Sequence, residues 1–340
     1  MVQTTEINSK SEATAQAQVK SKKTAKKVKP TVLAFDVANR TMQMSDGKKT
    51  SRIISVKRFL GKDAEMYFGT DTKFIRHQSG TEVGSTWQIG EQAAYFDSSV
   101  KTYTESKPDV CRDFFLAMMQ DFSKYQTIDT LKVIDSAPEA HLIKYRRALE
   151  GIHHWSYKNK KGQEIERTLT VKNIETVQEG QGAVNLYLKE HQAKKPFVVV
   201  YNFGGNTKDG LVFDSFGRLI PQYRKNFNGK GAVDLVNRIG QRLRQYEMIT
   251  FDATPEELFS ALENDGKLDG VYIYDVAKEV GKEWLSETHK SYCSTIAGIY
   301  KQVDKYILTG GLAHLFTEAF KDHAQIYVTP NPSTDNLAVL

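Results

Sequence analysis

The chain has 340 residues, of which 40% are hydrophobic and 11% aromatic, enough to build one large core or two medium ones. No apolar run approaches the ~20 residues that cross a bilayer, and the first residues lack the apolar stretch of a signal peptide. These features exclude a membrane-spanning class and predict a cytoplasmic globular protein. Cys111 and Cys293 are too few for a disulfide framework or a zinc cluster, so we expect both to be ordinary core residues.

The formal net charge of +6 is concentrated at the N-terminus, where residues 1–30 contain seven lysines and two glutamates. This segment has no aromatic residue and cannot bury enough apolar surface to offset the entropy of ordering. We therefore predict a disordered basic tail over residues 1–30. Its lysines suit contact with DNA, an anionic membrane or an acidic partner protein, and a purely solubilising tail is the alternative.

From Thr31 onward the polar, lysine-rich composition gives way to short apolar runs. Two short apolar runs, 31–35 and 41–44, flank the polar stretch 36–40 and predict a hairpin. Further strands are expected at 52–59, around 87–90 and within 152–171. Apolar residues at helical spacing predict a helix over 109–125, and another helix is expected to follow residues 179–183 and to end near 190.

The most apolar run of the chain, 196–201, is rich in β-branched residues and predicts a strand buried on both faces. A turn of small residues, 202–210, joins it to a second strand at 211–214, which repeats the design of residues 31–44. Helices are then expected at 231–246, 255–263 and 276–300. A last apolar strand, 305–308, leads into Gly310-Gly311 and a further helix.

Turns of small residues let backbone N–H groups approach an oxyanion closely, and two such turns facing each other can clamp a chain of phosphates. Asp36, at the end of the first strand, could hold a hydrated magnesium ion. Gly310-Gly311 is free of side-chain bulk and could pack against a base or ribose, although a Gly-Gly after a strand is commonly just a tight turn. The pattern favours a nucleoside triphosphate and Mg²⁺ as ligands.

Three segments occur in a fixed order: Phe-Asp-Val-Ala-Asn-Arg at 35–40, Asn-Phe-Gly-Gly-Asn-Thr-Lys-Asp at 202–209 and Leu-Thr-Gly-Gly-Leu-Ala at 308–313. This series resembles the phosphate-1, phosphate-2 and adenosine motifs of the actin/Hsp70/hexokinase superfamily. Segments 36–40, 87–93 and 179–183 resemble the ParM/StbA branch of actin-like proteins. The resemblance covers about residues 31–340 and implies an α/β, actin/Hsp70-type two-domain fold with a nucleotide cleft between the domains.

The resemblance also implies a domain organisation and a set of site residues. Domain I would span 31–190 and domain II 191–325, with 326–340 returning to domain I. Asp36 would lie near the metal. The residues implied to contact the nucleotide are Ala38, Asn39, Arg40, Asn202, Gly204, Gly205, Asn206, Thr207, Gly310, Gly311 and Leu312.

Glu179 occupies the position at which the family orients the water that attacks the γ-phosphate, a role that requires a hydrogen-bond acceptor. The alternative is an exposed carboxylate that caps a helix. Segment 229–233, which contains a glycine turn before a helix, is a further candidate for nucleotide contact.

Two residues depart from the family pattern. Asn202 stands where an Asp is usual, so the site has one negative charge fewer, and Ala38 stands where Gly is usual. We expect ATP or GTP to bind with Mg²⁺ and hydrolysis to be slow; a switch that mostly binds is the alternative.

The resemblance predicts a nucleotide-dependent protein that forms head-to-tail filaments, acting in plasmid DNA segregation through an adaptor protein, DNA-bound or free, or as a prokaryotic cytoskeletal filament. A small-molecule kinase of the same superfold and a non-hydrolysing structural filament stay open, because fold alone does not choose among them. The sequence contains no P-loop, no Rossmann turn and no readable nucleophilic triad. His153, His154 and His289 are expected to be solvated or core residues rather than metal ligands.

Overall fold

The computed structural model describes residues 30–38, 40–69, 71–96, 99–101, 106–332 and 334–340. The chain divides into two units, Met1–Pro30 and Thr31–Leu340. Residues 1–29 of the predicted basic tail, and Asn39 of the predicted first phosphate turn, lie outside the described residues. Every described helix is too short or too polar to traverse a bilayer.

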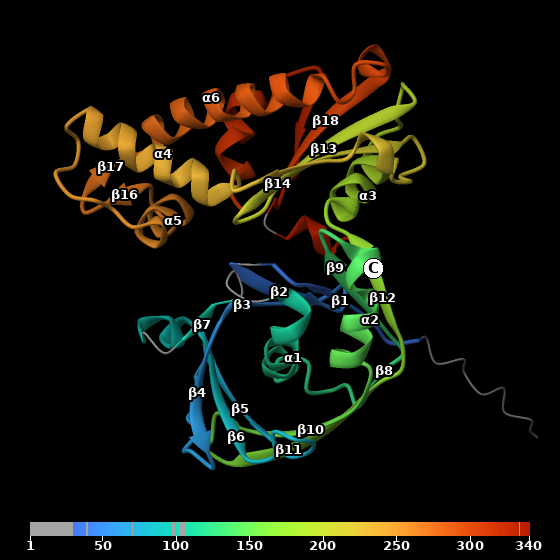
Figure 1. Cartoon of the computed structure of the whole chain (residues 1–340), viewed down its shortest axis with the longest axis vertical. Helices are drawn as coiled ribbons and strands as arrows, with labels where there is room; N and C mark the ends of the chain where they lie inside the picture. Colours follow the sequence, from blue (N-terminus) through green and yellow to red (C-terminus); the bar gives the residue numbers. More distant parts are fainter. Residues whose placement is uncertain (1–29, 39, 70, 97–98, 102–105, 333) are drawn as a thin grey trace, which may run out of the picture. The chain divides into compact units, whose positions relative to one another are not determined.

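One sheet in the first half of the chain contains the first predicted hairpin (Figure 1). Its strands, in spatial order, are β3 (Thr50–Ile54), β2 (Thr41–Ser45), β1 (Val32–Asp36), β9 (Thr130–Asp135) and β12 (Ile174–Gln178). The β1–β2 pair is antiparallel, which confirms the hairpin, whereas β9 runs parallel to β1 and β12 runs parallel to β9. Asp36 therefore lies at the carboxyl end of a central strand.

A second sheet repeats this topology in the second half of the chain. Its strands, in the corresponding order, are β15 (Lys225–Asn228), β14 (Thr207–Asp214), β13 (Phe197–Phe203), β18 (Val303–Gly310) and β19 (Ile326–Val328). The β13–β14 pair is antiparallel and β18 runs parallel to β13, as β9 does to β1. The two hairpins predicted from the sequence are thus equivalent parts of two sheets with one topology, and β14 begins at Thr207 instead of at 211.

A third sheet curves around helix α1 (Lys107–Met118) in Figure 1. Its strands, in spatial order, are β7 (Val100–Lys101), β4 (Val56–Lys62), β6 (Ser85–Gly90), β5 (Thr72–His77), β10 (Gly151–Lys158), β11 (Glu164–Val171) and β8 (Thr127–Ile128). Apolar residues of α1, among them Phe114, Phe115 and Met118, fill the space between the first and third sheets together with helix α2 (Pro138–Leu149). Helix α1 begins two residues earlier than predicted, because Pro108 suits its first turn, and it ends at Met118 rather than at 125.

Helices cover both faces of the second sheet. Helix α3 (Gln181–Glu190) packs on one face, and α4 (Ala232–Gln245), α5 (Pro255–Glu263) and α6 (Tyr274–Cys293) pack on the other. Helix α5 has the predicted bounds, because Thr254 and Glu257 form a capping box at its start. Helix α6 ends at Cys293 rather than at 300. The remaining elements are η1 (Glu91–Tyr95), η3 (Pro221–Tyr223), η4 (Tyr300–Gln302), η5 (Ala313–Phe316), α7 (Thr317–Phe320), η6 (Asp335–Leu337) and the hairpin β16 (Lys267–Leu268) and β17 (Val271–Tyr272).

The last residues of the chain lie against the first sheet. Leu337 and Val339 pack with Ala34 and Ile134, and Nζ of Lys132 donates to the carbonyl of Val339 at 2.6 Å. This packing places η6 beside the end of β1.

Candidate functional site

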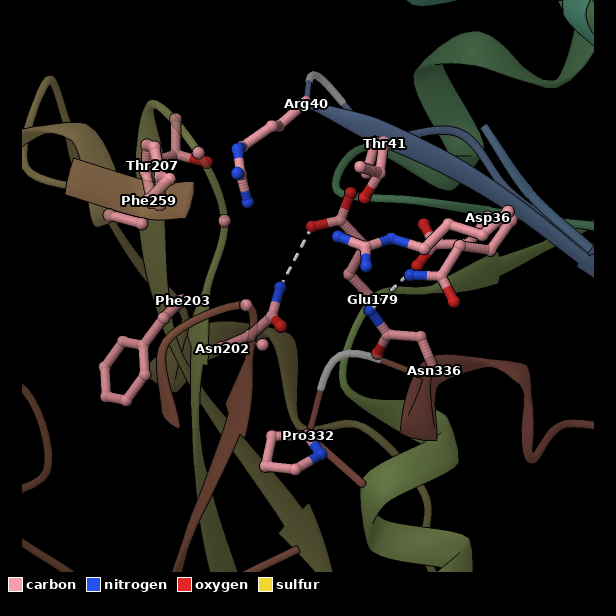
Figure 2. Close-up of a pocket in the computed structure, with 18 of the residues that line it drawn as sticks. Asp36, Arg40, Thr41, Glu179, Asn202, Phe203, Thr207, Phe259, Pro332 and Asn336 are labelled. Carbon is pink, nitrogen blue, oxygen red and sulfur yellow. Dashed lines mark hydrogen bonds between the residues drawn. The ribbon is translucent and has the colours of Figure 1, made fainter. Parts of the chain in front are cut away.

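A pocket of about 730 Å³, including the solvent at its opening, lies where the ends of β1, β13 and β18 meet (Figure 2). The predicted site residues that line it are Asp36, Ala38, Arg40, Glu179, Asn202, Gly204, Gly205, Thr207, Gly310 and Gly311. Residues that the sequence did not single out also line it, among them Lys107, Phe259, Glu263 and Asn336. Asn206 and Leu312 lie outside the lining, and Leu312 is buried in the core at 1% exposure.

The turn after β13 is built so that its carbonyls are bonded and its N–H groups are not. The carbonyls of Gly204 and Gly205 accept from the first N–H groups of α4, those of Ala232 and Val233, at 2.8 and 2.9 Å. The N–H groups of Gly204 and Gly205 donate to no described protein group. Such a row of free N–H groups is suited to an anion.

Segment 229–233 packs directly against the turn that contains Gly204 and Gly205. A Cβ on Gly231 would lie 2.5 Å from the carbonyl oxygen of Gly205, so only glycine allows α4 to approach so closely. Ala232 is the member of the segment that lines the pocket.

Gly310 has the left-handed φ of 100°, and a Cβ there would lie 2.5 Å from the carbonyl oxygen of Phe203. The N–H of Gly311 donates to the same oxygen at 3.2 Å, whereas a Cβ on Gly311 would meet no atom within 4 Å. Gly310 is therefore required by its backbone conformation and its close packing on Phe203, whereas Gly311 leaves an open face that suits a planar ligand group.

Glu179 is buried at 6% exposure, so it is not an exposed helix cap. Its Oε1 accepts from Nζ of Lys107 at 2.8 Å and its Oε2 accepts from Nδ2 of Asn202 at 3.0 Å. Figure 2 shows the side chains of Glu179 and Asn202 pointing toward one another. Both carboxylate oxygens are thus held, one by a residue of the first half of the chain and one by a residue of the second.

Asp36 is buried at 4% exposure, and its Oδ1 has no hydrogen-bond partner among the described residues. Its Oδ2 accepts from Nδ2 of Asn336 at 3.3 Å. Burial, and next the charge of Glu179, raises the pKa of Asp36 to about 7. A carboxylate that is buried and incompletely bonded is suited to a cation, so the residues present fit Mg²⁺ with its water shell.

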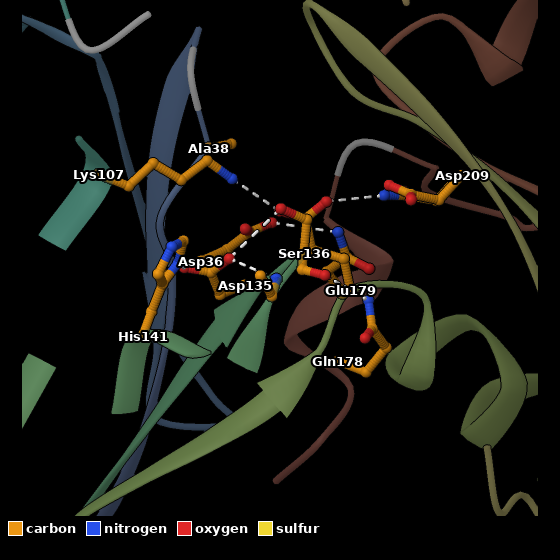
Figure 3. Close-up of polar contacts among 12 residues, drawn as sticks. Asp36, Ala38, Lys107, Asp135, Ser136, His141, Gln178, Glu179 and Asp209 are labelled. Atoms are coloured by element: carbon orange, nitrogen blue, oxygen red, sulfur yellow. Dashed lines mark hydrogen bonds and ion pairs between the residues drawn. The ribbon is translucent and has the colours of Figure 1, made fainter. Parts of the chain in front are cut away.

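Lys107 balances several carboxylates around Asp36 (Figure 3). Burial opposes its charge, but Glu179 and Asp135 raise the pKa of Lys107 overall. Burial likewise opposes the ionised form of Asp135, yet Lys107 and a hydrogen bond from Tyr145 lower its pKa. The sequence did not point to Lys107, because this residue precedes the predicted helix 109–125. Its position directly before Pro108 was the signal that could have indicated a helix start there.

Asp209 lies directly across the β13–β14 ladder from Asn202. It is buried at 1% exposure, its Oδ2 has no partner among the described residues, and burial followed by the charge of Glu179 raises its pKa to about 6. Its Oδ1 accepts from Asn226 at 2.9 Å and lies 3.6 Å from Nη2 of Arg224. Asn202 thus stands where the family that the chain resembles has a carboxylate, but the carboxylate of Asp209 lies opposite it in the same ladder.

Arg40 is held at the edge of the pocket by residues of α5. Its guanidinium pairs with both carboxylate oxygens of Glu263 and lies 3.9 Å from the ring centre of Phe259. Nη2 of Arg52 lies 3.6 Å from the same carboxylate.

The predicted histidines make ordinary contacts. His153 is buried and bonded to the carbonyl of Leu149, His154 contacts Thr168, and His289 contacts Tyr201. A metal-type grouping does occur elsewhere, at His77, Glu82 and Asp113. Its carboxylates are already paired, Asp113 with Lys57 and Glu82 with Arg112, so the local charge is largely balanced without an ion.

No protein-family model and no curated protein matches the chain. Solved structures do match it across about nine tenths of its length. An archaeal actin homologue in complex with ADP has a TM-score of 0.70 at 13% identity, covering 91% of this chain and 96% of the other. A 15-stranded ParM filament from Clostridium botulinum gives 0.66 at 15%, covering 91% and 97%, and the apo ParM protein of psk41 gives 0.64 at 14%, covering 90% and 94%. The chain therefore has the mixed α/β actin-like fold, as the resemblance implied.

Proposed function

We propose that this chain is an actin-like protein that binds ATP or GTP with Mg²⁺ and assembles into head-to-tail filaments. The observation that carries the proposal is the composition of one pocket. Free N–H groups of Gly204 and Gly205 and the unpartnered buried oxygen of Asp36 line it together. The first feature suits phosphate and the second suits the cation that accompanies it.

The residues have separable roles in this proposal. The turn after β13 and Arg40 would hold phosphates, Gly310-Gly311 would face the nucleoside, and Asp36 would hold the hydrated metal. When bound, Mg²⁺ would neutralise charge on the phosphates. Glu179 is the acceptor that would orient a water for attack on the terminal phosphate.

Hydrolysis is proposed to be slow. Each oxygen of Glu179 already accepts one hydrogen bond, from Lys107 or Asn202, so an attacking water would have to share the carboxylate with these two donors. The arrangement favours a long-lived triphosphate state.

Self-assembly is supported by the fold shared with solved filaments, one of ParM from Clostridium botulinum and one of Alp12. The proposed role is cytoplasmic: plasmid segregation through an adaptor, or a prokaryotic cytoskeleton. The basic residues 1–29 are proposed to contact DNA, anionic membrane or an acidic adaptor.

Two measurements test the proposal. Calorimetry with ATP and GTP, with and without Mg²⁺, should show binding that Asp36→Ala weakens only when Mg²⁺ is present. Sedimentation and electron microscopy should show filaments that depend on the nucleotide. Absence of binding at millimolar nucleotide contradicts the proposed ligand, and a monomer with every nucleotide contradicts the proposed assembly.

A further inference from the structure

Asn336 joins two parts of the candidate site that lie far from it in sequence. Its Nδ2 donates to Oδ2 of Asp36 at 3.3 Å, and its Oδ1 accepts from the N–H of Gly180 at 2.8 Å. Because the Gly180 N–H can only donate, it fixes which end of the amide faces Asp36. Figure 2 shows Asn336 beside Asp36 and Glu179.

Both contacts of Asn336 bear on residues with proposed chemical roles. The bond to Asp36 occupies Oδ2 and leaves Oδ1 as the oxygen without a described partner. The bond to Gly180 holds the residue that directly follows Glu179 and that has the left-handed φ of 89°. One amide therefore sets the orientation of the Asp36 carboxylate and the backbone that presents Glu179.

The segment that carries Asn336 is held firmly against α3. A Cβ on Gly182 would lie 2.1 Å from the carbonyl oxygen of Asp335 and 2.7 Å from that of Asn336, so the two backbones are in direct contact. Leu337 and Val339 pack under β1 on the other side of Asn336. Such anchoring gives the amide little freedom to follow Asp36 if the carboxylate turns.

We propose that Asn336 is a positioning residue that holds the Asp36 carboxylate and the Glu179–Gly180 backbone in register for the hydrated metal and the attacking water. This inference rests on the proposed function and extends it to a residue of the last turn of the chain. Groups that orient a metal-binding carboxylate commonly change metal affinity or activity by about 10–100-fold when they are removed.

The test compares Asn336→Ala with a matched control, Asn185→Ala. Asn185 Nδ2 donates to the carbonyl of Ala338 at 3.1 Å, so it ties down the same segment without a hydrogen bond to Asp36 or Gly180. For each full-length variant, calorimetry measures the affinity for Mg²⁺ at saturating ADP, and phosphate release gives kcat and KM for ATP or GTP, whichever the wild type binds.

Asn336→Ala should weaken Mg²⁺ binding and lower kcat by about tenfold or more, with KM changed only a few-fold. Asn185→Ala should resemble the wild type in both. Asn336→Gln, whose longer amide displaces Asp36 or Gly180, should not restore kcat.

Equal losses of Mg²⁺ affinity and kcat in Asn336→Ala and Asn185→Ala would show that the segment that carries Asn336 is only structural, and this would overturn the inference. Unchanged Mg²⁺ affinity and kcat in Asn336→Ala would overturn it as well. If the wild type binds no nucleotide, the proposed function fails, which is a separate result. A variant that does not fold is identified by circular dichroism, and Asn336→Ser then replaces Asn336→Ala in the comparison.

Discussion

The side-chain amide of Asn202 donates to Oε2 of Glu179 at 3.0 Å, so the residue that departs from the family pattern is a direct partner of the proposed catalytic carboxylate. An aspartate at this position would oppose one carboxylate with another inside a buried site. The departure therefore removes a repulsion as well as a charge.

Asn202→Asp should consequently destabilise the metal-free protein, by about 1–3 kcal/mol for a buried group that loses its hydrogen bond and gains a like charge. Millimolar Mg²⁺ should restore much of the lost stability, because the cation would lie near the carboxylates of Asp36 and Glu179 and the carboxylate added at position 202. Denaturant unfolding with and without Mg²⁺ measures both effects. Asn202→Ala, which removes the donor without adding charge, should show no such rescue; an equal Mg²⁺ response in both variants would contradict the explanation.

Glu179→Gln should lower the rate of phosphate release by about 10²-fold or more, as loss of a general base does, while nucleotide affinity stays within a few-fold. Glutamine keeps the shape of the side chain and so keeps an acceptor for Lys107. Glu179→Ala is less informative, since it leaves the buried Lys107 cation without its nearest partner. Single-turnover kinetics and calorimetry separate the two quantities, and unchanged turnover in Glu179→Gln would remove Glu179 from the mechanism.

Glu263→Gln should raise nucleotide affinity about two- to fivefold, the magnitude of an exposed ion pair, because it releases Arg40 toward the phosphates. Titration of each variant with nucleotide tests this. Glu256→Gln, which removes a charge from an exposed position of the same helix, should have no effect. Weaker binding in Glu263→Gln would mean that the Arg40–Glu263 pair itself forms part of the binding site.

The Asp36 carboxyl of the metal-free protein should contribute a loss of stability as pH rises from about 4 to about 7. The unfolded chain ionises Asp36 near the ordinary aspartate pKa of 3.8, whereas in the folded chain this carboxyl has a pKa of about 7 and retains its proton. Between these values the folded state binds more protons, so raising the pH favours unfolding. Denaturant midpoints across this range should fall less steeply in Asp36→Asn than in the wild type; parallel profiles would show that Asp36 does not titrate there.

Lys208→Met should stabilise the protein at pH 7 by about 1–3 kcal/mol, as replacement of buried charge by an apolar side chain often does. Lys208 is 3% exposed, its ammonium lies 3.8 Å from the ring centre of Trp284, and burial lowers its pKa to about 8. Lys225→Met is the control, because Lys225 is more exposed and lies near the shared neighbour Phe227; it should change stability by less than about 0.5 kcal/mol. A destabilised Lys208→Met would indicate that the hydrogen bond to Thr288 outweighs the burial of charge.

Features encoded locally were predictable from the sequence. The run at 196–201 predicted β13 because a strand buried on both faces is continuously apolar, and the helix expected over 255–263 has the bounds of α5. The region 130–149 gave no prediction, although it contains β9 and α2. Helix α2 buries only Tyr145 and Leu149, which is too few residues to reveal a helical period.

The sequence predicted the turns of the candidate site but did not predict the partners of its charged side chains. Glycine-rich turns reveal themselves by composition, and Asp36 by its place after a strand. Asn336 lies 300 residues from the aspartate that it contacts, and Lys107 lies 72 residues from Glu179. Nothing in the neighbouring sequence of either residue indicates the partner, because the fold alone brings them together.

Two arginines connect the first and second halves of the chain, and they differ in the kind of group that each contacts. Arg40 pairs with Glu263 through charged groups that remain partly exposed, whereas Arg224 donates to the backbone carbonyl of Ser136 and lies near the buried Asp209. Salt screens exposed ion pairs and scarcely weakens a bond to a carbonyl. High ionic strength should therefore weaken the contact between the two halves at Arg40 first, while the Arg224 contact persists.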